Sequence, residues 1–321
     1  MPFGIRPSNV RVCHSTTRAR QKFNQELRKA RNRNQLLRHN VSRFNLRKSV
    51  ASRSRLLAKS GWEGWIGEGC CVICGRMPAT DWIKVDLHIH TLDDPKDAVD
   101  YSAHQLLERA RALGFRVLAI TLHDAVFDRQ EVFADAAAMG ILLIPAAEVR
   151  LCGADVIILN VTGEEIAELK NFDDLRRLRA RRGNSVFTIA PHPFYVFGSS
   201  IGSRLLAEID CFDAIELCHF HKGLFNPNRR GVRVASRFGK PMIATSDAHR
   251  LHAFGRHYTS IPTPPELTIE NVLTLLRAGE LRLTSPSSSF IDLVSAFYFV
   301  LLAHPFRRRR KGRHILNSND S

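Results

Sequence analysis

Hydrophobic residues in the central part of the chain occur in short, nearly continuous runs that alternate with longer amphipathic segments. Runs rich in Val, Ile, Leu and Ala predict strands that are covered on both faces, as in parallel sheets. Such runs lie at Val85–His90, Val117–Thr121, Leu142–Val149, Asp155–Val161, Ser185–Ala190, Asp213–Leu217 and Pro241–Thr245. The amphipathic segments predict helices over Ala103–Leu113, Arg129–Met139, Ile166–Arg182, Arg229–Phe238 and Ile269–Gly279. Repeated β–α units of this kind are typical of a parallel α/β barrel or a doubly wound sheet.

Most of the predicted strands are followed by His, Glu or Asp. The series is His88 and His90, His123 and Asp124, Glu148, His192, His219 and His221, and Asp247 and His249. In a barrel, functional residues come from the carboxyl ends of many strands, whereas a doubly wound sheet concentrates them at its switch point. We therefore expect an α/β fold with a distorted, TIM-like, seven-stranded parallel barrel. Imidazole and carboxylate ligands together suit Zn, Mn or Fe, which indicates a metal-dependent hydrolase.

Basic residues are concentrated at the two ends of the chain. The formal net charge of +16 divides into +14 for residues 1–76, −3 for residues 77–306 and +5 for residues 307–321. The central part, in which we place a hydrolase domain over residues 77–286, is therefore mildly acidic. This distribution argues against nucleic-acid binding by the body of the protein and leaves that role to the termini.

Residues 1–76 are expected to form a basic, disordered extension. The first 60 are rich in Arg, Ser and Asn and contain few clustered apolar residues, so they cannot bury enough surface to offset their ordering entropy. Three interpretations compete: a nucleic-acid-binding arm, a transit peptide for organellar import, and an extension foreign to the native protein, which we favour. No secretory signal opens the chain and the seven cysteines lack framework spacing, so we expect a cytoplasmic protein with reduced thiols.

Residues 287–321 are expected to form an apolar helix followed by a basic tail. The uncharged run Leu293–Ala303 has eleven residues, whereas a membrane span needs roughly 20. We expect this helix to dock on protein, and the alternative is an interfacial membrane contact assisted by Arg307–Lys311.

Four short motifs together resemble the PHP (polymerase and histidinol phosphatase) superfamily. They are Asp86-Leu-His-Ile-His-Thr91, Ala119-Ile-Thr-Leu-His-Asp124, Ala190-Pro-His-Pro193 and Ser246-Asp-Ala-His249. The resemblance covers about residues 83–260 and implies a distorted seven-stranded barrel, a site for two or three divalent metal ions, and phosphoester hydrolysis. The expected substrate is a phosphomonoester or phosphodiester of a small metabolite, attacked by a metal-bound hydroxide.

The resemblance also implies which residues hold the metal ions. The first ion would be held by His88, His90, Glu148 and Asp247, and Glu148 would bridge to a second ion completed by His192. A third site would consist of His123 and His249 with Asp93 or Asp94. Asp247 and His249 are the expected catalytic residues, and candidates for substrate binding are His219, His221 and Arg250. A bridging carboxylate is chemically sensible because two ions held together stabilise both the attacking and the leaving oxygen of a displacement.

Two positions depart from the family pattern. Leu122 stands where the family usually has Asp, and the predicted strand Asp155–Val161 contains no histidine. The second metal would then be held more weakly or be completed by His219 or His221. Two other functions stay open: a nuclease that acts on nucleic-acid ends and uses the basic arm for phosphate contacts, and a non-catalytic scaffold that uses its basic termini.

Overall fold

The computed structural model describes residues 81–195, 199–223 and 226–288. The predicted basic extension over residues 1–76 lies outside the described residues, and so does nearly all of the predicted carboxyl-terminal segment 287–321, including Leu293–Ala303. The predictions made for these two ends, and the domain boundaries drawn from them, therefore stay predictions. Among the helices that the structure describes, none has both the length and the apolar character required to cross a membrane.

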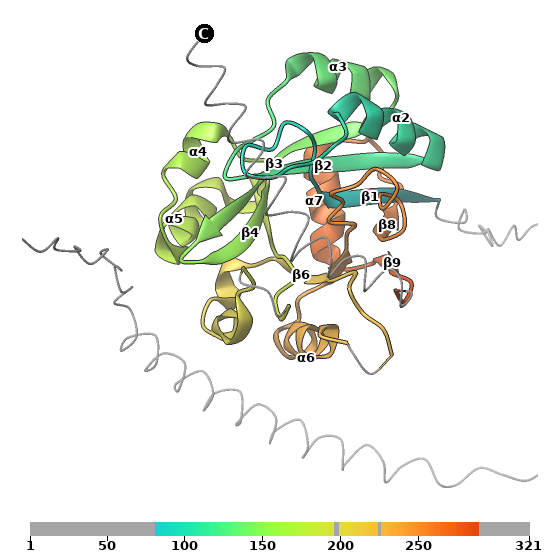
Figure 1. The fold of residues 1–321 in the computed structure, drawn as a ribbon. Coiled ribbons are helices and arrows are strands. Elements are labelled where there is room, and N and C mark those ends of the chain that lie inside the picture. The colour runs from blue at the N-terminus through green and yellow to red at the C-terminus, as the bar shows by residue number, and fades with distance from the viewer. Residues whose placement is uncertain (1–80, 196–198, 224–225, 289–321) are drawn as a thin grey trace, which may run out of the picture. The chain divides into compact units, whose positions relative to one another are not determined.

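The described residues form a mixed α/β domain around one sheet of nine strands (Figure 1). The strands are β1 (Trp82–Ile89), β2 (Phe115–His123), β3 (Leu142–Leu151), β4 (Ala154–Leu159), β5 (Phe187–Ala190), β6 (Ala214–Leu217), β7 (Met242–Ala244), β8 (Tyr258–Pro262) and β9 (Arg282–Thr284). The α-helices are α2 (Ala103–Leu113), α3 (Gln130–Ala138), α4 (Gly163–Ala167), α5 (Phe172–Arg182), α6 (Asn228–Phe238) and α7 (Ile269–Ala278). Short 3-10 helices span Gly183–Ser185, Gly202–Leu206 and Ile209–Cys211.

The prediction of seven strands is wrong in number, although each predicted strand is present. β1 to β7 lie close to the predicted ranges, and β8 and β9 extend the sheet beyond β1 in the order β7-β6-β5-β4-β3-β2-β1-β8-β9. The two additional strands have five and three residues and contain polar or exposed side chains such as Ser260 and Arg282. They therefore lack the apolar runs by which the other strands are recognised.

The sheet is mixed, so the prediction of a purely parallel barrel is also wrong. β4 is antiparallel to both β3 and β5, and β8 is antiparallel to both β1 and β9. β3 and β4 are joined by the two-residue turn Cys152-Gly153, whose φ angles are both positive, at 49° and 82°. Such a turn joins antiparallel strands, because a parallel pair needs a crossover of a dozen or more residues.

The two ends of the sheet approach each other, which makes the barrel nearly closed. At the end of β7, the Ala244 amide donates to the Thr259 hydroxyl on β8, and this hydroxyl donates to the Ala244 carbonyl, both at 2.9 Å. Just after β7, Ala248 forms a parallel bridge with Ile89 of β1. The closure therefore brings the segment after β7 beside the carboxyl end of β1.

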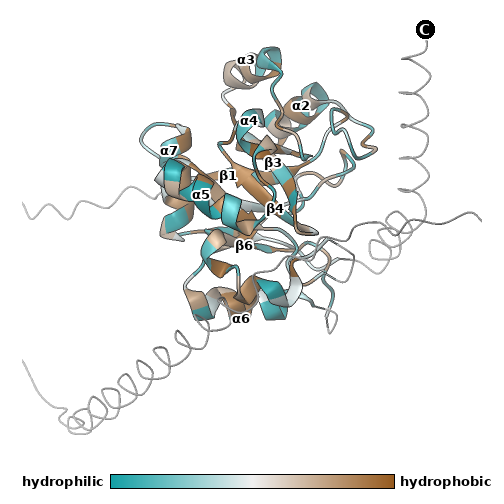
Figure 2. Cartoon of the chain, turned by 90° about the vertical axis from the view of Figure 1, so that its left-hand side faces the viewer, coloured by the Kyte–Doolittle hydropathy of each residue, from teal (hydrophilic) through white to brown (hydrophobic). Residues whose placement is uncertain are grey.

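The helices lie around the apolar strands, and four of the five predicted helices are confirmed within two residues at either end. Figure 2 shows β1 as apolar and inside the domain, whereas α5 carries a hydrophilic surface. The predicted helix Ile166–Arg182 is instead divided into α4 and α5. The Asn171 side chain accepts hydrogen bonds from the backbone amides of Asp173 and Asp174 and begins a second helix there.

Candidate metal centre

Histidines and carboxylates from six strands or their following loops meet at the carboxyl end of β1. The contributing elements are β1 with His88 and His90, β2 with His123, β3 with Glu148, β4 with Asp155, the loop after β5 with His192, and the loop after β7 with Asp247 and His249. Asp247 is held beside β1 because its backbone amide donates to the His88 carbonyl at 2.9 Å. The barrel closure thus brings together residues that lie far apart in the sequence.

The histidines of β1 and two carboxylates form the innermost part of the cluster. His88 Nε2 lies 3.4 Å from both Glu148 Oε2 and Asp247 Oδ1, and His90 Nε2 lies 3.4 and 3.5 Å from the same oxygens. Both imidazoles are fully buried, and neither Nε2 atom has a hydrogen-bond partner among the described residues. Buried polar atoms normally have a partner. Two imidazole nitrogens that face carboxylate oxygens in this way are suited to binding a divalent cation, which would be the partner of both nitrogens.

Carboxylates behind the imidazoles determine which ring nitrogen faces the cluster. His88 Nδ1 lies 2.8 Å from Glu216 Oε1, and Asp94 Oδ2 lies 3.0 Å from His90 Nδ1 and 2.8 Å from His123 Nδ1. An Nδ1 proton donated to a carboxylate leaves the Nε2 lone pair directed at the cluster, as in many metal sites. Asp94, predicted as a ligand, therefore lies in a position to orient two histidines.

Glu216 is a site residue that the sequence did not reveal. It is 2% exposed in the middle of β6, and its Oε2 accepts a hydrogen bond from the His192 amide at 2.5 Å. The available signal is a single acidic residue within the otherwise apolar run Ala214–Leu217. A buried charge is rarely kept without a partner or a ligand, so an acidic residue in an apolar strand indicates a site.

Glu148 has a second group of neighbours on its other oxygen. His192 Nε2 lies 3.3 Å from Glu148 Oε1 and 4.0 Å from Asp155 Oδ2. His123 Nε2 lies instead 3.3 Å from Glu148 Oε2, the oxygen that His88 and His90 also contact. Ligand atoms of Glu148, Asp155 and His192 all lie within 4.8 Å of one another. The group beside His192 is completed by Asp155 of β4, in the predicted strand that lacks a histidine.

His249 lies beside His90 at the more open edge of the cluster. The two imidazole rings stack with centroids 4.4 Å apart, and His249 Nε2 lies 2.7 Å from Asp97 Oδ2. Of the two aspartates considered for a third site, Asp93 accepts from the Thr91 hydroxyl and from Arg129, whereas Asp94 contacts the cluster histidines. Ligand atoms of His90, Asp247 and His249 also lie within 4.8 Å of one another.

The cluster has strongly coupled charges and a strained backbone. Burial alone would raise the pKa values of Glu148 and Asp247, but the neighbouring His88 and other imidazoles hold both well below the usual range. Burial would lower the pKa of His88, but Asp247, Glu148 and Glu216 raise it well above its ordinary value. His192 and Asp247 have φ angles of 29° and 45°. Perturbed pKa values and residues in left-handed conformations concentrate at functional sites.

The three predicted substrate-binding residues have different surroundings. His219 is half-buried, and its removal from water lowers its pKa to about 4, while the carboxylates of Asp247 and Glu216 act in the opposite direction. It therefore lies near the cluster. His221 Nε2 instead lies 3.2 Å from the Ser285 hydroxyl oxygen, and no contact places it with the ligands in the described part of the chain.

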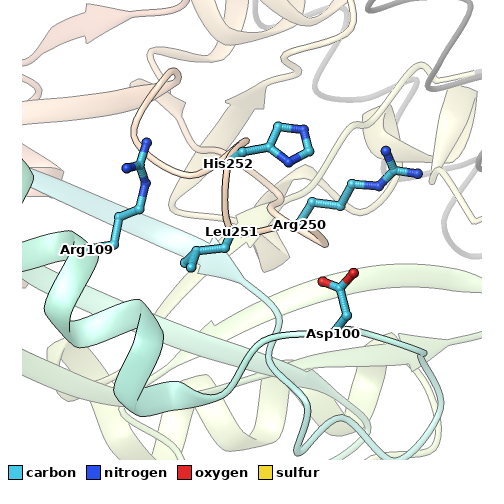
Figure 3. Close-up of a pocket in the computed structure, with 5 residues that line it drawn as sticks. All are labelled: Asp100, Arg109, Arg250, Leu251 and His252. Carbon is cyan, nitrogen blue, oxygen red and sulfur yellow. The ribbon is translucent and has the colours of Figure 1, made fainter.

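Arg250, which follows His249, lines a pocket of about 580 Å³. Its other lining residues are Asp100, Arg109, Leu251 and His252. Figure 3 shows Arg109 projecting from α2, while Arg250, Leu251 and His252 come from the loop after the last ligand. A pocket with two guanidinium groups is suited to an anionic part of a ligand.

The chain is similar in sequence to one protein family and in fold to several solved structures. Residues 225–281 match a family described as PHP-associated, and no curated protein matches the sequence significantly. The fold is similar to that of a two-domain protein from Bacteroides vulgatus containing a predicted PHP-like metal-dependent phosphoesterase. That likeness has 18% identity and a TM-score of 0.51, over 68% of this chain and 69% of the other.

Two other solved structures are less similar in fold. PsfC from Pseudomonas syringae has 17% identity and a TM-score of 0.48, over 71% of this chain and 99% of that chain. The lesion-specific endonuclease from Pyrococcus furiosus has 14% identity and a TM-score of 0.46, over 68% and 66%. A nearly closed α/β barrel with histidines and carboxylates at one rim is the architecture expected of the PHP superfamily. With the PHP-associated match and the Bacteroides fold, the predicted resemblance to this superfamily is confirmed.

Proposed function

We propose that the chain is a metal-dependent hydrolase of phosphoric esters. The observation that carries this proposal is the pair of buried Nε2 atoms of His88 and His90, which lack partners among the described residues and lie 3.4–3.5 Å from carboxylate oxygens. The donor set suits two or three divalent ions such as Zn, Mn or Fe. The superfamily relationship supports phosphoester bonds as the target.

The residues of the cluster divide into ligands and groups that orient them. The proposed ligands of the first ion are His88, His90, Glu148 and Asp247. The second ion would be held by Glu148, Asp155 and His192, and a third by His123 and His249. Glu216 and Asp94 would hold the histidines in the tautomer that binds metal. Bound ions of this kind polarise a phosphoryl group and lower the pKa of water, which supplies a nucleophile near neutral pH.

Exposure indicates the side from which a substrate would approach. Asp247 and His249 are 17% and 23% exposed, whereas His88, His90 and Glu148 are between 0 and 2% exposed. A phosphoryl group would therefore meet the side of the cluster that holds Asp247, His249 and the 21% exposed His123, which supports the proposed catalytic roles of Asp247 and His249. His219 lies near the cluster and Arg250 lines the adjacent pocket, and both are suited to substrate binding. We leave His221 out of the proposed site because its ring contacts Ser285.

The proposed substrate is a phosphomonoester or phosphodiester of a small metabolite. The pocket beside Arg250 supports a small ligand, because such ligands bind in concave sites with a few placed polar groups. A second candidate function is hydrolysis at nucleic-acid ends. It is favoured by the arginine-rich helix α6, which adjoins the cluster.

Release of hydrolysis products by the whole chain tests this proposal. The protein is loaded with Mn or Zn, with and without chelator. Inorganic phosphate is measured for phosphomonoesters, and the alcohol and monoester products are separated by chromatography for phosphodiesters and short oligonucleotides. We expect chelator-sensitive release and a loss of at least about 100-fold in turnover for Asp247→Asn, because one ligand carries a large share of the electrostatic stabilisation. The matched control is Asp173→Asn, since the Asp173 side chain is 66% exposed and pairs with Arg176.

Metal content provides an independent readout of the same variants. Elemental analysis should show less bound metal in Asp247→Asn than in Asp173→Asn and the native chain. Release that continues at the full rate under chelation would contradict metal dependence. Substoichiometric metal together with no turnover on any ester would favour a non-catalytic scaffold.

A further inference from the structure

Helix α6 carries four arginines on its exposed side. They are Arg229, Arg230, Arg233 and Arg237, and the opposite side of the helix buries Asn228, Gly231, Val234 and Ala235. Arg229, Arg233 and Arg237 follow one another at intervals of four residues, so they lie on one side, about 6 Å apart along the helix axis. We call these four residues the α6 arginine face, and it is about 12 Å long.

The arginines of α5 provide a contrast within the same domain. All five, Arg176, Arg177, Arg179, Arg181 and Arg182, form ion pairs with carboxylates of the chain. No such pair with a described residue is formed by the α6 arginine face. Arg233 donates instead to the Arg229 carbonyl at 3.2 Å, and Arg237 lies over the Phe238 ring. The α6 charge is therefore available to an external anion.

The charge of the surrounding chain makes this face distinctive. Residues 77–306 have a net charge of −3 even with the four α6 arginines included. Four positive charges that form no ion pair with the described residues therefore lie together on one helix of an otherwise acidic part of the protein. Local concentrations of one sign attract partners of the opposite sign, whatever the overall net charge of the domain.

An extended polyanion fits the shape of this face. A helix surface is convex, whereas small ligands bind in concave pockets. An interfacial membrane helix inserts apolar side chains, but the apolar residues of α6 face the core, and Val232 is its only large hydrophobic residue among those described as exposed. Along a nucleic-acid duplex each strand presents a phosphate about every 3.4 Å. A 12 Å row of guanidinium groups therefore spans about three or four phosphates, with geometry suited to bidentate contacts.

Helix α6 also adjoins the candidate metal centre. The Asn228 side chain bonds the backbone amide and carbonyl of Cys218, both at 2.8 Å, which fixes the start of the helix at the end of β6. A β-carbon on Gly231 would lie 3.9 Å from Cγ of Pro193, the residue after the candidate ligand His192. In Figure 1, α6 lies on the outside of the domain below β6.

We propose that the α6 arginine face binds the phosphodiester backbone of a nucleic-acid duplex. Binding by this face does not depend on any catalytic activity.

The test compares salt-dependent binding by full-length variants. Fluorescence anisotropy of a labelled duplex oligonucleotide is measured with chelator present, so that no turnover occurs. The variant removes three arginines in register along the helix, Arg229→Gln, Arg233→Gln and Arg237→Gln. The matched control removes the same charge from other exposed positions, Arg111→Gln, Arg177→Gln and Arg181→Gln. Any contribution of the basic extension is common to all of these proteins.

We expect the α6 variant to lose three phosphate contacts. On B-form DNA each contact contributes about 0.9 to the slope of log K against log salt, so the magnitude of the slope falls by about 3. The affinity at physiological salt should fall at least about tenfold, and the control should keep both values. An Arg→Lys variant at the same three positions should retain most of the slope, because the positive charge is preserved.

Two results would overturn the proposal. One is an unchanged slope and affinity in the α6 variant whose thermal unfolding matches that of the native chain. The other is an unchanged affinity for the oligonucleotide with lost binding to phosphatidylserine vesicles, which would assign the face to a membrane. Because chelator is present throughout, failure of the hydrolase proposal leaves this measurement unaffected.

Discussion

Glu216 offers the most direct test of how the candidate metal centre is built. Its Oε1 lies 2.8 Å from His88 Nδ1 and accepts from the Thr245 hydroxyl, while its Oε2 accepts from the His192 amide at 2.5 Å. One buried carboxylate thus orients a proposed ligand from β1 and fixes the backbone of another after β5. Glu216 acts through these neighbours and is a positioning residue.

The substitution Glu216→Gln keeps the shape of the side chain and removes its charge. Loss of a partner that orients a metal-binding histidine typically weakens metal affinity 10–100-fold, which corresponds to about 1.4–2.7 kcal/mol. The new amide also has one acceptor oxygen for the three donors that the carboxylate serves. At least one buried donor is then left without an acceptor. Apart from the weaker metal binding, we therefore expect the free energy of unfolding to fall by about 1–3 kcal/mol.

Competition with a chelator measures the metal affinity, and urea denaturation measures the stability. The control is Glu270→Gln, because Glu270 lies on the exposed surface of α7 and its substitution should leave both quantities unchanged. The Nδ1 proton signal of His88 should be shifted in Glu216→Gln, a change that a purely global destabilisation would not produce. Native metal affinity together with an unchanged His88 signal would refute the view that Glu216 orients this ligand.

Two further predictions concern stability. Asp213 accepts from the Arg179 guanidinium at 2.6 and 3.0 Å, and this pairing outweighs the effect of burial and lowers the pKa of Asp213. Asp213→Asn should therefore lower the free energy of unfolding by about 2–3 kcal/mol at neutral pH. Because the folded pKa is depressed, this difference should shrink as the pH falls below about 3.9, the unfolded value; a constant difference in urea denaturation down to pH 3 would contradict the reasoning. Gly153→Ala should cost about 1–2 kcal/mol because φ is 82° in the β3–β4 turn. Thermal unfolding of Gly163→Ala is the control, since Gly163 lacks a positive φ and also has open space around its Cα.

Several features of the fold follow from local sequence alone. The apolar runs mark β1 to β7 because burial on two faces requires nearly continuous hydrophobic residues. The spacing of His88 and His90 places both imidazoles on one face of β1, since side chains alternate along a strand. The antiparallel direction of β4 can also be predicted from the sequence, because the short link between Leu151 and Ala154 is incompatible with a parallel crossover. These features depend on residues that are close together in the chain.

The sequence by itself therefore determined the strands β1 to β7, most of the helices, and a set of metal-binding residue types at strand ends. Only the tertiary structure decided the partners of these residues. Glu216 meets His88 across 128 positions, Asp155 joins the group around Glu148 and His192, and the arginines of α6 lack the carboxylates that those of α5 have. Local patterns report burial and periodicity. Hydrogen bonds, ligand geometry and ion pairing depend instead on how closure of the barrel places distant strands and loops beside one another.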